Sequence, residues 1–106
     1  MLKQMNERTP SPGNNEYIVT QELLDGVRQD LIGELEHSLR FYGPDWVNKS
    51  NCEELIGKLR NKEPTIIQSP LWGDFVDATL HDMGIPNSGE TRDTYFEIWR
   101  RIEAGE

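Results

Sequence analysis

The chain has 106 residues, enough for one domain with a single hydrophobic core and too few for two. Its formal charge of -8 disfavours direct binding to nucleic-acid phosphates, and no apolar run approaches the roughly 20 residues that a membrane-spanning helix needs. The single cysteine, Cys52, excludes an internal disulfide, so we expect a reduced, cytoplasmic protein.

The beginning of the chain is polar and has little to bury. It contains Pro10, Pro12 and Gly13, and no apolar stretch of the kind found in secretory signals. We therefore predict a disordered tail over residues 1–15, followed by a single helical domain over residues 16–106.

Residues 20–42 predict one long amphipathic helix, on which the rest of the chain is expected to pack. Thr20 can cap its start, and Gly43-Pro44 can end it. At 100 degrees per residue, five apolar side chains fall within roughly 80 degrees of one another, and two more widen the same stripe. The stripe consists of Leu24, Val27, Leu31, Leu35 and Tyr42, widened by Ile32 and Leu39.

A second, short helix is predicted over residues 51–60. Ser50 and Glu53 have the spacing of a capping box ahead of the apolar residues of this segment. After Pro64, the β-branched residues 65–67 are expected to be extended and to pair with residues 17–19.

A third helix is predicted to start at Ser69-Pro70, because a capping hydroxyl precedes a proline at the first helical position. The segment 84–86 ends it. Its apolar arc consists of Trp72, Phe75, Val76, Thr79, Leu80 and Met83, and Asp74, Asp77 and His81 lie on the opposite side.

A fourth helix is predicted over residues 89–104, with Ser88 as its cap. Its apolar face consists of Tyr95, Ile98, Trp99 and Ile102, with Phe96 at the edge. The predicted fold is therefore mainly all-α: a small single domain of about four helices packed on the long first helix, with a two-stranded extended patch as a minor addition.

Two residue pairs have spacings that occur in catalytic or metal sites. Glu34 and His37 match half of the carboxylate-histidine pattern of di-iron bundles, but the chain contains no second copy. Asp77 and His81 lie one turn apart on a face that should be wet, and no nucleophile or glycine-rich loop accompanies them. We therefore expect no catalytic residue, no metal site and no cofactor, and we expect Cys52 to be a spectator.

Charge favours a protein partner over nucleic acid. Residues 75–101 have the outline of a helix-turn-helix, but the acids on both helices would repel phosphate. The first and third helices carry acidic faces that could meet a basic surface, and Phe41 and Phe96 are the aromatic residues expected to stay most exposed. The expected partner-binding residues are Asp30, Glu34, Phe41, Trp46, Asp74, Asp77 and Phe96.

We interpret the sequence as that of a non-enzymatic acidic binding protein that regulates or inhibits a protein partner by occupying one of its surfaces. One alternative is a nucleic-acid mimic that blocks the basic groove of a nuclease or of a guided complex. A second is a small enzyme or metal-binding protein built on Glu34, His37, Asp77 and His81. Residues 17–30 also resemble the beginnings of many short accessory and bacteriophage proteins, but this resemblance covers no family motif.

Overall fold

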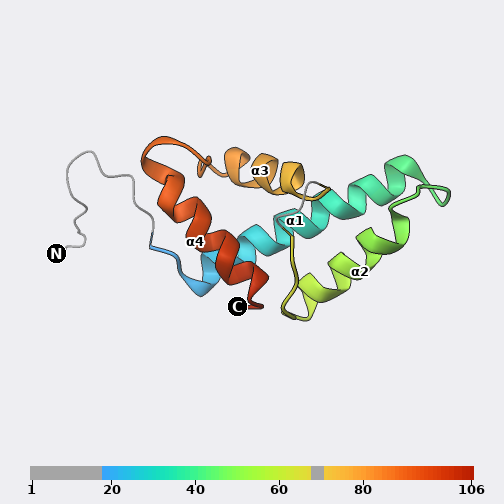
Figure 1. Cartoon of the computed structure of the whole chain (residues 1–106), viewed down its shortest axis with the longest axis horizontal. Coiled ribbons are helices and arrows are strands. Elements are labelled where there is room, and N and C mark those ends of the chain that lie inside the picture. Colours follow the sequence, from blue (N-terminus) through green and yellow to red (C-terminus); the bar gives the residue numbers. More distant parts are fainter. Residues whose placement is uncertain (1–17, 68–70) are drawn as a thin grey trace.

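Helix α1 (Gln21–Tyr42) is the element against which the others pack, and the prediction of a mainly all-α fold is confirmed. The computed structural model describes residues 18–67 and 71–106, so the predicted tail lies outside it. Figure 1 shows α2 and α3 on different sides of α1, with α4 crossing its N-terminal part. No helix of the described ranges is long and apolar enough to cross a membrane. The other helices are α2 (Lys49–Arg60), α3 (Gly73–Asp82) and α4 (Arg92–Glu103), with a 3-10 turn at Gly89–Thr91.

Both ends of α1 are fixed by the residues that the sequence indicated. The Thr20 hydroxyl oxygen accepts a hydrogen bond from the Leu23 N–H at 3.1 Å, which is an N-terminal cap. At the other end, Gly43 has a φ of 80° and donates its N–H to the Leu39 carbonyl at 3.1 Å. That left-handed conformation favours glycine, so the helix ends there.

Helix α2 begins earlier than predicted, and its predicted capping box is wrong. The helix starts at Lys49, and Asn48 occupies the cap position without a side-chain cap bond. Ser50 and Glu53 both lie inside the helix, where Glu53 accepts a hydrogen bond from the Lys49 ammonium at 3.2 Å. An ion pair between residues one turn apart therefore takes the place of the capping box.

The starts of α3 and α4 also differ from prediction. Ser69 and Pro70 both lie outside the described ranges, and α3 begins at Gly73. Ser88 makes no side-chain cap bond. Instead, Thr91 donates its hydroxyl to the Pro86 carbonyl at 2.8 Å. This bond holds the 3-10 turn together, so the predicted fourth helix is divided into that turn and α4.

Residues 65–67 contact α4 rather than the segment before α1. The Thr65 N–H donates to the Glu103 carbonyl at 2.9 Å, and the Ile67 N–H donates to the Glu103 carboxylate at 2.9 Å. Carbonyls in the last turn of a helix have no partner within the helix, so an extended chain can bond to them. The predicted two-stranded patch is therefore wrong for the described residues, which contain no strand; Tyr17 lies outside them.

The predicted apolar stripe forms the core except at its C-terminal end. Leu24, Leu31 and Leu35 are at most 1% exposed, whereas Tyr42 is 54% exposed. Figure 1 shows the reason, because the last turn of α1 extends beyond α3. The stripe packs on side chains from every other helix, including Leu55, Leu59, Val76, Leu80, Ile98, Trp99 and Ile102.

One charged side chain lies inside that stripe. Arg28 is 2% exposed, and its Nη1 donates to the Asp25 carboxylate at 3.0 Å. Its Nε and Nη2 have no hydrogen-bond partner in the described structure. The Lys62 ammonium lies 3.2 Å from the same Asp25 oxygen. Arg28 is therefore a buried cation held by a carboxylate that it shares with a second cation.

Candidate functional site

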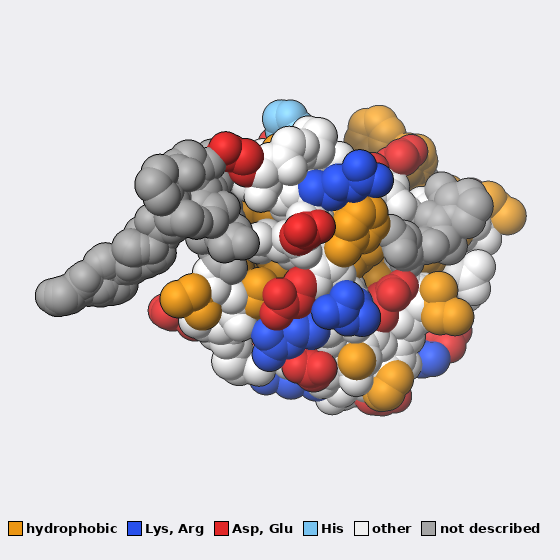
Figure 2. All heavy atoms as spheres, turned by 60° about the vertical axis from the view of Figure 1, so that its left-hand side comes forward, with side chains coloured by type: hydrophobic (Ala, Val, Ile, Leu, Met, Phe, Trp, Pro, Cys, Tyr) orange, Lys and Arg blue, Asp and Glu red, His pale blue; other side chains and the backbone are white. Residues whose placement is uncertain are grey.

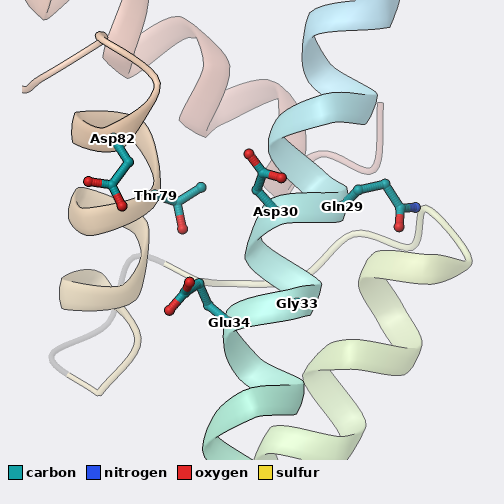
Figure 3. A pocket seen from close by; sticks show the side chains of 6 residues that line it. All are labelled: Gln29, Asp30, Gly33, Glu34, Thr79 and Asp82. Atoms are coloured by element: carbon teal, nitrogen blue, oxygen red, sulfur yellow. The ribbon is translucent and has the colours of Figure 1, made fainter.

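A hollow between α1 and α3 is lined largely by carboxylates. It has a volume of about 270 Å³ and is open to solvent. Figure 3 shows Asp30 and Glu34 pointing from α1 toward α3, while Thr79 points from α3 toward α1. Asp82 of α3, together with Gln29 and Gly33 of α1, completes the lining. We call this hollow the acidic groove.

Local structure explains how each helix contributes to the acidic groove. Asp30 and Glu34 are one turn apart, so the regular period of α1 places both carboxylates on one side of the helix. The Thr79 hydroxyl donates to the Phe75 carbonyl at 2.8 Å, which leaves its methyl group to face the neighbouring helix. A Cβ atom added to Gly33 would meet nothing within 4 Å. The surrounding atoms therefore leave room for a larger residue at this position, and the absence of a side chain on Gly33 makes the groove deeper.

Ion pairing differs between the two sides of α1. On the side facing α2, Glu36 pairs with Arg60, and Asp25 pairs with Arg28 and Lys62. On the side facing α3, no ion pair joins a groove carboxylate to a cation within residues 18–67 and 71–106. The sequence explains this difference, because no Lys or Arg occurs between Lys62 and Arg92. Unneutralised negative charge therefore gathers where α1 and α3 meet.

The end of the molecule that carries α4 has a different character. Figure 2 turns this end toward the viewer and shows basic and acidic side chains interspersed on it. Arg101 contacts the carboxylates of Glu97 at 3.3 Å and of Glu106 at 2.8 Å. Glu97 and Arg101 are one turn apart on α4. Local pairing offsets much of the negative charge on this face.

Asp77, a predicted partner-binding residue, has a structural contact. The Tyr95 hydroxyl donates a hydrogen bond to the Asp77 carboxylate, which ties α3 to α4. Burial of the Tyr95 phenol and the nearby Asp77 charge raise the Tyr95 pKa above its ordinary value, so the hydroxyl stays protonated. Asp74 lies one turn earlier and is exposed. Asp74 is therefore free to meet a partner, whereas Asp77 also holds the fold together.

Phe41 and Trp46 lie together at the C-terminal end of α1. The Phe41 ring meets the Tyr42 ring edge to face at 5.0 Å between centroids, and the Tyr42 ring stacks on Trp46 at 4.6 Å. Phe41 is 72% exposed, as expected, and Trp46 is half-buried. We call Phe41, Tyr42 and Trp46 the aromatic tip.

Phe96 belongs to neither the acidic groove nor the aromatic tip. It lies on α4, where its ring contacts Tyr95 at 5.2 Å and has the Arg92 guanidinium 5.8 Å from its centroid. It is half-buried against the core, so the expectation that it would be among the most exposed aromatic residues is wrong. The seven predicted residues thus divide into two on the groove, two on the outer side of α3, two on the tip, and Phe96.

The residue pairs considered for chemistry are not assembled into a site. His37 stacks on Phe41 at 6.5 Å, while Glu34 faces the acidic groove. The described residues contain no group of three His, Cys, Asp or Glu side chains that could hold a metal ion. Cys52 is buried, and its thiol donates to the Leu35 carbonyl at 3.5 Å. Burial and the neighbouring Glu53 raise the Cys52 pKa, which lowers the thiolate fraction.

Four lining residues of the acidic groove were not among the predicted binding residues: Gln29, Gly33, Thr79 and Asp82. Asp82 follows Thr79 by three residues, and Thr79 was placed on the buried arc, so helical period alone puts Asp82 at the edge of that arc. Gly33 is exposed on α1, but nothing in the sequence placed it opposite α3. Asp82 could therefore have been found from spacing, whereas the role of Gly33 depends on how two helices pack.

Comparison of the chain with protein-family models, with curated proteins and with solved structures found no match.

Proposed function

We propose that this is a non-enzymatic binding protein that regulates or inhibits a protein partner by covering a basic surface of that partner with its α1–α3 face. The observation that supports this proposal best is the acidic groove, whose three carboxylates form no ion pair with a cation of the described residues. Asp74, exposed on α3, extends the same negative field. A field of one sign attracts a surface of the opposite sign and speeds encounter.

The expected contribution of the groove follows from its exposure to water. Exposed ion pairs contribute about 0.2–1 kcal/mol each, so three groove carboxylates together account for roughly a threefold to 150-fold change in affinity. Electrostatics of this size selects the partner and sets its orientation, and apolar contacts must supply the remaining affinity.

Two further features support binding over chemistry. The Asp77 carboxylate is engaged by the Tyr95 hydroxyl, and the Cys52 thiol is buried with a raised pKa. Neither is arranged as an activated base or nucleophile. We place the interaction in the cytoplasm, where a lone buried thiol stays reduced.

The test is capture of the partner from a nuclease-treated extract of the source cells on the immobilised full chain. A groove variant carries Asp30→Asn, Glu34→Gln and Asp82→Asn. A matched control carries Glu22→Gln, Glu63→Gln and Asp93→Asn, which are exposed carboxylates elsewhere with the same change of charge. We expect the wild type and the control to retain the same protein, and the groove variant to bind it at least about threefold more weakly, because only that variant removes the groove carboxylates.

Equal retention by the groove variant and the control would show that the α1–α3 face does not bind the partner. Added duplex DNA separates the nucleic-acid mimic from the general case. Release of the captured protein by DNA, together with its recovery only below moderate salt, would identify the partner's surface as a nucleic-acid groove.

A further inference from the structure

The aromatic tip exposes apolar surface that nothing in the described structure covers. Phe41 is 72% exposed, Tyr42 54% and the adjacent Val47 88%. The three rings of the tip hold one another in place through the edge and stacking contacts. Rigid aromatic side chains lose little conformational freedom when a partner binds, which is why they are common among the residues that dominate binding energy.

The aromatic tip and the acidic groove lie along one side of α1. At 100 degrees per residue, Asp30, Glu34, His37 and Phe41 fall within about 60 degrees of one another. Phe41 follows Asp30 by three turns, which is about 16 Å along the helix axis. A single elongated segment can therefore contact the groove carboxylates and the Phe41 ring at the same time.

We propose that the occupant of this combined surface is an amphipathic helix of the partner protein, and this rests on the function proposed above. One end of that helix carries Lys or Arg and meets the acidic groove. An aliphatic or aromatic side chain about three turns away meets the aromatic tip. A helix fits because the surface is a furrow between two helices and the described residues offer no strand edge that an extended peptide could join.

Charge selects this occupant over a second copy of the chain. A second copy would bring its own charge of -8 against the unpaired carboxylates of the groove, and the two surfaces would repel. A helix that is basic at one end complements the groove and leaves the tip free for its apolar end.

The experiment uses two synthetic, fluorescein-labelled peptides of about five helical turns. One has a Lys-rich end and a Leu-rich face at the other end; the second is identical except that Ser replaces Leu. Each peptide is titrated with four forms of the full-length protein. These are the wild type, Phe41→Ser, Ile66→Ser and a carboxylate variant that combines Asp30→Asn with Glu34→Gln. Ile66 is 78% exposed and lies in the segment after α2, so it is a matched control for loss of exposed apolar surface. Circular dichroism checks that each variant is folded.

We expect the Leu-containing peptide to bind the wild type and Ile66→Ser equally, and Phe41→Ser about tenfold more weakly, because the ring no longer buries apolar surface. The affinity of Phe41→Ser for this peptide should fall with salt concentration as steeply as that of the wild type. The affinity of the carboxylate variant should fall less steeply. Binding should also shift the emission of Trp46, since Trp72 and Trp99 are already buried. The Ser-containing peptide should bind the wild type and Phe41→Ser alike.

If Phe41→Ser binds the Leu-containing peptide as tightly as the wild type while the carboxylate variant is weakened, the role of the tip is wrong and the proposed function stands. If the carboxylate variant also binds normally, both proposals fail. Absence of binding to the wild type at low salt would overturn the amphipathic helix as the occupant.

Discussion

Replacing Arg28 by Met should leave the free energy of unfolding unchanged or raise it by about 1–4 kcal/mol, because a buried ion pair is often no better than apolar packing. Arg28 is 2% exposed and leaves two guanidinium nitrogens without partners in the described residues. Asp25 would keep the Lys62 ammonium at 3.2 Å, so the substitution leaves no unpaired carboxylate. Equilibrium unfolding in urea measures the effect.

Two comparisons separate loss of charge from loss of packing at this position. Arg28→Ala should be less stable than Arg28→Met by about 2–5 kcal/mol, because it leaves a cavity in the core. Asp25→Asn should lower stability at neutral pH, since Arg28 would lose the carboxylate that it contacts at 3.0 Å. A large loss of stability in Arg28→Met would show that the buried guanidinium is a net stabilising group.

The same carboxylate sets an expected pH dependence. Hydrogen bonds from Gln21 and Lys62, together with the charges of Lys62 and Arg28, hold the pKa of Asp25 below its ordinary value. A carboxyl group with a lower pKa in the folded state stabilises the fold above its unfolded pKa of about 3.9, and this stabilisation is lost as the pH falls through the folded pKa. Asp25→Asn should therefore flatten the acid side of the stability profile.

Leu35→Ala should lower the free energy of unfolding by about 2–5 kcal/mol, whereas Tyr42→Ala should lower it by about 1 kcal/mol or less. The two residues are one heptad apart and share the apolar stripe of α1. Leu35 is fully buried, but Tyr42 is 54% exposed. Deleting Leu35 therefore leaves a cavity, whereas deleting Tyr42 loses mainly its contact with Trp46. Unfolding of both variants under identical conditions gives the comparison, and equal losses would contradict the position of the core.

The contrast between Leu35 and Tyr42 illustrates how far the sequence predicts this fold. Period, cap and glycine signals are local, so they gave the limits of α1 and the residues of its buried face. These local signals carry no information on the lengths of the neighbouring helices. Those lengths decide how far along α1 the side chains are buried. Ser50 and Ser88 were wrongly assigned as caps: α2 already begins at Lys49, and the Thr91 hydroxyl bonds to the Pro86 carbonyl in a 3-10 turn that precedes α4.

The position of Arg28 within the apolar stripe could be predicted from the sequence, but its burial could not. Helical period places it about 40 degrees from Leu24 and about 20 degrees from Leu35, inside the stripe. An arginine in such a stripe often extends its head to water, and only the packed structure shows that this one remains buried.

The candidate site was predicted in part. The sequence indicated that Asp30 and Glu34 lie on an acidic face and that Phe41 is exposed. It did not indicate that Asp82 meets them across a hollow, because the register between α1 and α3 depends on core packing. It also named Phe96 as an exposed partner-binding residue, although Phe96 is half-buried on α4.

Carboxyl labelling of the captured complex, read by mass spectrometry, tests the central claim most directly. Asp30, Glu34 and Asp82 are exposed, so each should be labelled in the free protein and protected in the complex, while Glu22, Glu63 and Asp93 should label equally in both. Protection confined to the second group, or equal labelling of the groove carboxylates with and without partner, would contradict binding through the α1–α3 face.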